Sequence, residues 1–212
     1  VKEQKKIWGS CNTSKNIYIN SKNINEQSSK EIAKNMAVLP QSPQAPGGLT
    51  VEELIAYGRF PHQSGFKNNK QEDKEIVDWA LKATGISEFR DRKIEDLSGG
   101  QRQRAYIAMV IAQGTEYIFL DEPLNNLDMN NSVQMMRVLR KLCDDLNKTV
   151  VIVIHDINFA SCYSDYIVCL KNGMIAKEGT VDEIINKETL ESIYEMDFKV
   201  EEIDGNKISI YF

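Results

Sequence analysis

The sequence predicts an α/β protein that is built on a mostly parallel sheet with crossover helices. Strand and helix patterns alternate from Tyr117 onward, which is the order that a parallel sheet requires. The continuous β-branched run at Thr149–Ile154 is typical of a strand that is buried on both faces. The chain has 212 residues, enough for one sizeable domain or for a domain with a subdomain.

The composition argues against several classes of protein. The chain carries 26 basic and 31 acidic residues, and no lysine- or arginine-rich block indicates nucleic-acid binding. Its four cysteines include no CxxC pair, and its two histidines do not suggest a zinc site. No apolar run approaches the roughly 18 residues that indicate a membrane span, and the N-terminus has no signal-peptide core. We therefore expect an intracellular chain whose membrane role comes through a partner.

The first half of the chain predicts short elements around a proline-rich loop. Three prolines and two glycines make Pro40–Gly48 irregular. After this loop, Thr50 and Glu53 form a capping box that begins a helix, and Gly85 closes a later one. The expected elements are a strand at Asn16–Asn20, a helix at Ser28–Asn35, a buried strand at Met36–Leu39, the helix from Thr50, and a helix at Glu72–Thr84.

The second half contains the predicted parallel sheet. The apolar stripe of one helix is formed by Val133, Met136, Leu139 and Leu142. Hairpins are expected where Asn or Asp precedes Gly, at Asn172–Gly173 and Asp204–Gly205. The expected elements are a turn at Leu97–Gly100, helices at Gln101–Gln113, Asn131–Leu146 and Ile157–Tyr163, and strands at Tyr117–Leu120, Thr149–Ile154 and Tyr166–Leu170.

The stretch "LSGGQ" at Leu97–Gln101 combines glycines with a helix N-terminus. Gly99 and Gly100 allow a positive φ and a close approach of the backbone to a ligand. Ser98 can cap the helix, with Gln101 three residues on. The hydroxyl and the free N–H groups of such a terminus are suited to phosphate. Taken alone, "SGG" favours an ordinary capping box after a turn.

Polar side chains follow three predicted strands. Asp121 and Glu122 come at the carboxyl end of Tyr117–Leu120, where ligands bind in open parallel sheets. Because successive strand side chains point apart, one acid can bind Mg²⁺ while the other orients or deprotonates a water. His155 and Gln41 follow the other two strands and can contact a phosphate there. Each of these residues alone is more often a plain loop residue.

The order of these motifs resembles the nucleotide-binding subunit of ABC transporters. This resemblance implies a P-loop NTPase-type fold that binds ATP and Mg²⁺, with Asp121 as the magnesium-linked aspartate and Glu122 as the catalytic glutamate. It further implies that His155 is the switch histidine, that Gln41 belongs to the Q-loop and binds the metal with Asp121, and that Asp128 belongs to the D-loop. The signature motif is then Ser98, Gly99, Gly100 and Gln101.

The same resemblance implies the domain organisation and the partners. A single domain at 1–212 contains an inserted helical subdomain at 42–96, which docks on a membrane subunit, and a C-terminal β-hairpin at 198–212. Two such subunits meet head to tail, so that each ATP lies between one P-loop and the other signature motif. The segments around Ser42–Gln63 and Ile193–Phe212 are most similar to the iron–siderophore branch of importer ATPases. The expected location is the cytoplasmic face of the membrane, without a nucleic-acid partner.

The P-loop of the family, G-x-x-x-x-G-K-[ST], has no match in the chain. In the nearest segment, Gly9–Asn16, Ser14 replaces the second glycine and a strand pattern follows instead of a helix. We therefore expect an N-terminally truncated ABC ATPase with an incomplete N-terminal lobe. Open apolar edges are then expected on the neighbouring strands, Tyr117–Leu120 and Thr149–Ile154 among them.

The sequence-based prediction of function is an ABC importer ATPase, with iron–siderophore complexes as the transported class. The alternative is a non-hydrolysing module that lends its signature motif to a complete partner. The missing P-loop favours this alternative, whereas Glu122 and His155 favour hydrolysis. An ABC-type ATPase that acts on DNA or ribosomes would need coiled-coil insertions or a basic linker, and the sequence has neither.

Overall fold

The computed structural model describes residues 17–63 and 70–212, so the segment Gly9–Asn16 lies outside the described residues. The chain divides into two compact units, Val1–Val153 and Ile154–Phe212. In the described part of the chain, no helix has the length and apolar character needed to cross a bilayer.

The first unit contains a three-stranded parallel sheet, which confirms the predicted α/β class. The sheet has the order β3-β4-β5, and its register pairs Leu39 with Leu120 and Leu120 with Ile152. Its strands are β3 (Met36–Leu39), β4 (Tyr117–Asp121) and β5 (Thr149–Val153). Because the strands are parallel, their carboxyl ends lie along one edge of the sheet, where the candidate site residues follow.

The helices of the first unit include the two capping boxes that the sequence predicts, at Thr50 and Ser98, and a third at Ser28. Gly85 follows a helix with a φ of 65°. The helices are α1 (Ser29–Asn35), α2 (Val51–Tyr57), α3 (Lys70–Ala83), α4 (Gly99–Ala112) and α5 (Met129–Asp144), with 3₁₀ turns at Ile24–Glu26, Phe60–His62, Ser87–Phe89 and Ile94–Asp96.

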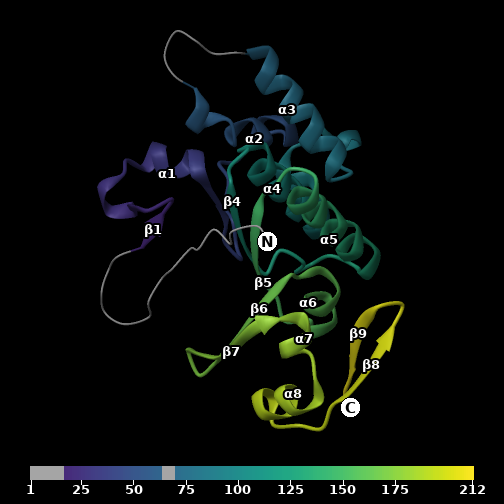
Figure 1. Cartoon of the computed structure of the whole chain (residues 1–212). Coiled ribbons are helices and arrows are strands. Elements are labelled where there is room, and N and C mark those ends of the chain that lie inside the picture. Colours follow the sequence, from purple (N-terminus) through teal and green to yellow (C-terminus); the bar gives the residue numbers. More distant parts are fainter. Residues whose placement is uncertain (1–16, 64–69) are drawn as a thin grey trace. The chain divides into compact units, whose positions relative to one another are not determined.

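A helical layer of α2, α3 and α4 packs together in the first unit (Figure 1). Ile55, Leu81 and Ile107, one from each helix, are fully buried. Arg59 is also buried; its Nε donates to Asp73 of α3 at 2.8 Å and its Nη1 donates to the Ala112 carbonyl of α4 at 2.8 Å. This pairing satisfies the buried guanidinium, as a buried charge requires. Two helices of the layer, α2 and α3, lie within the predicted subdomain 42–96, whose boundaries stay a prediction.

The second unit is built from short helices and two hairpins. The hairpins have two-residue turns at Asn172–Gly173 and Asp204–Gly205, as predicted. The elements are α6 (Ile157–Tyr163), β6 (Tyr166–Lys171), β7 (Met174–Thr180), α7 (Val181–Ile184), α8 (Lys187–Tyr194), β8 (Lys199–Ile203) and β9 (Asn206–Ile210). Its core consists of Ile157, Ile184, Ile185, Leu190 and Phe198.

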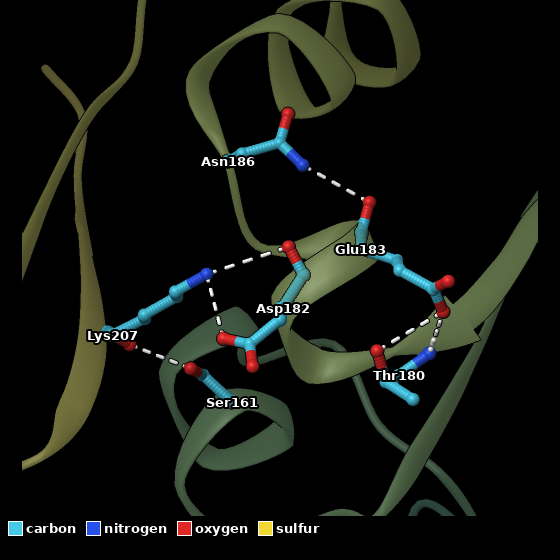
Figure 2. A network of polar contacts seen from close by, with 6 residues as sticks. All are labelled: Ser161, Thr180, Asp182, Glu183, Asn186 and Lys207. Atoms are coloured by element: carbon cyan, nitrogen blue, oxygen red, sulfur yellow. Dashed lines mark hydrogen bonds and ion pairs between the residues drawn. The ribbon is translucent and has the colours of Figure 1, made fainter.

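Polar contacts hold the C-terminal hairpin within this unit (Figure 2). Lys207 of β9 forms an ion pair with Asp182 at 2.8 Å, and the Ser161 hydroxyl of α6 donates to the Lys207 carbonyl at 2.6 Å. The Asn158 side chain donates to the Ser209 carbonyl and accepts from the Ser209 N–H. The side chains of Asn158 and Ser161 thus form hydrogen bonds with backbone groups at the edge of β9, in the way that a neighbouring strand would.

Two predictions about the strands are wrong. The strand Thr149–Ile154 is predicted to be buried on both faces, but no residue of β5 is buried. Val151 and Val153 are 41% and 50% exposed, and β5 is an edge strand of the described sheet. The predicted open edge of Tyr117–Leu120 is also absent, because β4 lies between β3 and β5.

Two further predictions need correction. The alternation of parallel strands does not continue past β5, because β6 pairs antiparallel with β7. The predicted strand Asn16–Asn20 is reduced to β1 (Tyr18–Ile19), which pairs with β2 (Lys22–Asn23). Here Asn20 and Ser21 adopt positive φ angles of 50° and 64°, so the chain turns back instead of continuing as a strand.

Candidate functional site

The loop between β4 and α5, residues 122–128, lies at the carboxyl edge of the parallel sheet. Asp121 ends β4 and is exposed, opposite Val153 of β5. Glu122 lies beyond the strand with a φ of 47°, a left-handed conformation that is uncommon for a residue with a side chain. Its N–H still donates to the Val153 carbonyl at 3.1 Å. Glu122 therefore lies in a turn and not in the strand, so the alternation of strand side chains does not apply to this pair.

The structure brings Gln41 onto Glu122. Gln41 follows β3, and its Nε2 donates to Oε2 of Glu122 at 2.6 Å. Two of the predicted site residues, separated by 81 positions in the chain, thus form one contact. This contact exists because β3 and β4 are neighbouring parallel strands that end at the same edge.

Asp128 is the N-cap of α5. Its carboxylate accepts from the backbone N–H of Asn131 at 2.8 Å and from the Asn131 side chain at 2.8 Å. The backbone hydrogen bond, followed by smaller effects from the side-chain amide and from Arg104, holds the pKa of Asp128 below its ordinary value. Asp128 is therefore an anion that fixes the start of α5 at the end of the site loop.

The predicted capping box of "LSGGQ" is present at the start of α4. The Gln101 N–H donates to the Ser98 hydroxyl at 3.3 Å, and the Ser98 N–H donates to the Gln101 side chain at 3.0 Å. Gly99 and Gly100 do not use the positive φ that glycine allows, because both lie in the first turn of the helix. A Cβ on Gly100 would lie 3.0 Å from the Asn126 carbonyl oxygen. The glycine therefore serves a close approach between the helix start and the site loop.

His155 is exposed and follows β5 in the chain, as predicted, but it belongs to the second unit. Within the first unit, the contacts join Gln41 to Glu122 and bring the start of α4 to the site loop.

Two further residues, one in the site loop and one packed against it, were not predicted from the sequence. Asn125 Nδ2 donates to Glu122 Oε2 at 2.5 Å, and the buried Gln103 side chain donates to the Pro123 carbonyl at 3.1 Å. An asparagine three residues after a glutamate is a weak signal, because asparagine is common in turns for other reasons. Gln103 has no distinguishing signal in the helix pattern.

The oxygen-rich donor set suits a hard cation. Asp121 provides a carboxylate at the sheet edge and Gln41 an amide oxygen from the neighbouring strand end. Within residues 17–63 and 70–212, no group of three or more His, Cys, Asp or Glu side chains could hold a metal ion by itself. The pair of Asp121 and Gln41 fits Mg²⁺, because this ion keeps several waters and takes one or two protein ligands together with substrate phosphates.

A family model described as "ABC transporter" matches residues 5–125. The chain is 51% identical over 196 residues to the petrobactin import ATP-binding protein YclP of Bacillus subtilis, covering 92% of this chain and 77% of that protein. It is 48% identical to the iron(3+)-hydroxamate import ATP-binding protein FhuC of Bacillus subtilis, with 87% and 68% covered. The ferric enterobactin transport ATP-binding protein FepC of Escherichia coli is 40% identical, with 84% and 66% covered.

Solved structures give the same result. A metal-chelate type ABC transporter in an inward-facing conformation matches with a TM-score of 0.73 and 26% identity, covering 84% of this chain and 71% of that chain. The dimeric cassette MJ0796 bound to ADP and phosphate matches with a TM-score of 0.71 and 28% identity, covering 80% and 74%. The fold of the chain agrees with these solved structures. The chain therefore belongs to the ABC transporter family, as one of its nucleotide-binding, ATPase subunits.

Proposed function

We propose that this chain acts in an importer of iron–siderophore complexes, where ATP binding and hydrolysis are coupled to transport through membrane permease subunits. The contact of Gln41 with Glu122 at 2.6 Å, beside Asp121, is the observation that carries the proposal. It joins a strand-end amide to the carboxylate that the family uses in hydrolysis. The proteins named for petrobactin, iron(3+)-hydroxamate and ferric enterobactin support the substrate class.

In this proposal each site residue has a separate role in ATP binding or hydrolysis. Asp121 and Gln41 hold Mg²⁺, which offsets the charge of the phosphates when it is bound. Glu122 accepts the proton of the attacking water, and His155 contacts the γ-phosphate. Ser98, Gly99, Gly100 and Gln101 contact the nucleotide of a second ATPase subunit, and Asp128 holds the start of α5 beside that interface. The two subunits meet head to tail, and the dimeric MJ0796 structures support this arrangement.

The permease surface that we propose lies on the helical layer. A groove of about 260 Å³ runs beside the proline loop and α2, and Pro40, Pro43, Tyr57 and Met109 are among its lining residues. Tyr57 and Phe60 are 53% and 70% exposed, whereas Leu54 is buried. Leu54 therefore belongs to the packing of the layer, and Tyr57 and Phe60 are the side chains for contact. This surface would hold the chain at the cytoplasmic face of the membrane through its partner.

The docking surface can be tested by co-purification with the permease subunits. Tyr57→Ser and Phe60→Ser should each weaken co-purification without lowering the melting temperature, because both side chains are largely exposed. Trp79→Ser is the matched control, since Trp79 is an aromatic residue of α3 that is 43% exposed and lies outside the segment Gln41–Phe60 that we propose for contact. Unchanged recovery of the permease with both variants would remove the basis for this surface.

The hydrolytic role of Glu122 can be tested in a chimera, in which the P-loop segment of a related subunit is fused ahead of this chain. Glu122→Gln should lower turnover by at least about 100-fold while ATP still drives dimer formation, because the amide keeps the size of the side chain but cannot accept the proton. Turnover and the ATP-dependent dimer fraction are measured together. Undiminished turnover in this variant would rule out Glu122 as the general base.

A further inference from the structure

The Glu122 carboxylate accepts hydrogen bonds from two different side-chain amides. Its Oε2 accepts from Gln41 Nε2 at 2.6 Å and from Asn125 Nδ2 at 2.5 Å. The two donors differ in origin. Gln41 comes from the end of β3, whereas Asn125 lies three residues after Glu122 in the same loop. Both amides therefore lie within hydrogen-bond distance of the same carboxylate oxygen.

The backbone around Asn125 is fixed on several sides. The Asn125 N–H donates to the Glu122 carbonyl at 3.2 Å, and this closes a turn around the left-handed Glu122. Within this turn, the carbonyl of Pro123 is held by buried Gln103 of α4 at 3.1 Å. Asp128 caps α5 at the other end of the loop. Because these contacts fix the backbone of the loop, they also fix the position from which the Asn125 side-chain amide donates to the Glu122 carboxylate.

We propose that Asn125 is a positioning residue for Glu122, which fixes the direction of the carboxylate through the donation of its side-chain amide to Oε2. This proposal deepens the proposed function and rests on it, because the positioning serves the water that Glu122 activates there. Gln41 has a second task in that function, as a ligand of Mg²⁺. When its amide turns toward the metal, Asn125 is the donor that stays with Glu122, since it belongs to the same loop.

The competing explanation is that Asn125 only shapes the turn. Asparagine is favoured in turns, and its backbone N–H takes part in this one. The two explanations differ in what they require of the side chain. A turn-forming role is met equally well by aspartate, which has the same size and a similar turn preference. The positioning role needs a donor opposite the carboxylate, and aspartate cannot supply one.

The test uses the chain itself and measures the side-chain rotamer at position 122 by NMR three-bond couplings. The wild-type chain should give the couplings of a single χ1 rotamer. Asn125→Asp should move them toward values averaged over several rotamers, because one of the two amide donors to Oε2 is replaced by a second carboxylate, which repels that of Glu122. The double variant Glu122→Gln/Asn125→Asp exchanges donor and acceptor, so the amide introduced at position 122 can donate to the new carboxylate. It should restore the single-rotamer couplings.

Asn126→Asp is the matched control. It makes the same change one residue further along the loop, where the side chain lies beside Gly99. It should leave the couplings of Glu122 as in the wild type. The backbone N–H resonance of position 122, which reports the contact with Val153, shows in each variant that the loop keeps its fold.

Three results would overturn the proposal: averaged couplings in the wild type, a single rotamer that persists in Asn125→Asp, or averaged couplings in the double variant with the N–H resonance of position 122 unchanged. None of them bears on whether Glu122 acts as a base. That question is decided by the turnover of the Glu122→Gln chimera, so failure of the positioning role and failure of the proposed function give different results.

Discussion

Asp128 links the site loop to the stability of α5. Its pKa is depressed in the folded chain, mainly by the Asn131 N–H. A depressed pKa means that the charged form contributes stability above the unfolded pKa, which is about 3.9, and that this contribution is lost as the pH falls through the folded pKa. Asn at this position also caps a helix but does not titrate.

The free energy of unfolding of the wild type, minus that of Asp128→Asn, should therefore decrease as the pH falls below about 4. Urea titrations of both proteins between pH 3 and 7 measure this difference, and the other carboxyl groups cancel in it. A difference that stays constant over this range would mean that the cap does not depend on the charge of Asp128.

At the residue scale, the sequence predicts contacts between residues that are close in the chain better than contacts between distant ones. The capping box of Ser98 and Gln101 could be predicted, because both partners lie within one helical turn. The contact between Gln41 and Glu122 could not be predicted as a bond, because it depends on the register of β3 against β4. Asn125 was missed because a turn-former gives no sign of which side chain it contacts.

At the element scale, the packing of α2 against α4 depends on Gly58. A Cβ at this position would lie 2.2 Å from the Met109 carbonyl oxygen and 3.2 Å from the Gln113 nitrogen. Both atoms belong to the backbone of α4 and its C-cap, so they cannot move aside as the end of a side chain can. The φ of Gly58 is −57°, so the conformation itself suits any residue.

Gly58→Ala should therefore lower the free energy of unfolding by roughly 3 kcal/mol through overpacking. Gly47→Ala is the control, because its Cβ would meet only the Glu95 side chain at 4.0 Å. Chemical denaturation of the two variants measures the effect. If the two changes were equal, the close approach of α2 and α4 would not be a determinant of stability.

The elements also show where a sequence pattern fails. The β-branched run of β5 predicts a strand, which is correct, but it carries no information on what covers the strand. Val151 and Val153 are exposed for that reason. Similarly, the sequence of β6 predicts a strand but not its neighbour, and the tight turn at Asn172–Gly173 pairs β6 with β7 instead of with the parallel sheet.

At the scale of the whole molecule, the chain carries the signature motif and the site loop of its family but no match to the P-loop sequence. The proposed function assigns Ser98 and its helix N-terminus to the nucleotide of a second subunit. In the structure, Ser98 is exposed at the start of α4, so a partner can reach it. This chain should therefore associate with a subunit that holds ATP on a P-loop of its own.

Capture of the Glu122→Gln chimera by the immobilised 212-residue chain measures this association. With ATP and Mg²⁺ the chain should capture the chimera, and with ADP or without nucleotide it should not. Ser98→Arg in the immobilised chain should abolish capture, because the larger side chain fills the space of the phosphate. Ser87→Arg, at another exposed serine of the same unit, should leave it unchanged. Capture that is independent of ATP, or that survives Ser98→Arg, would contradict the assignment of this chain as the signature half of a shared ATP site.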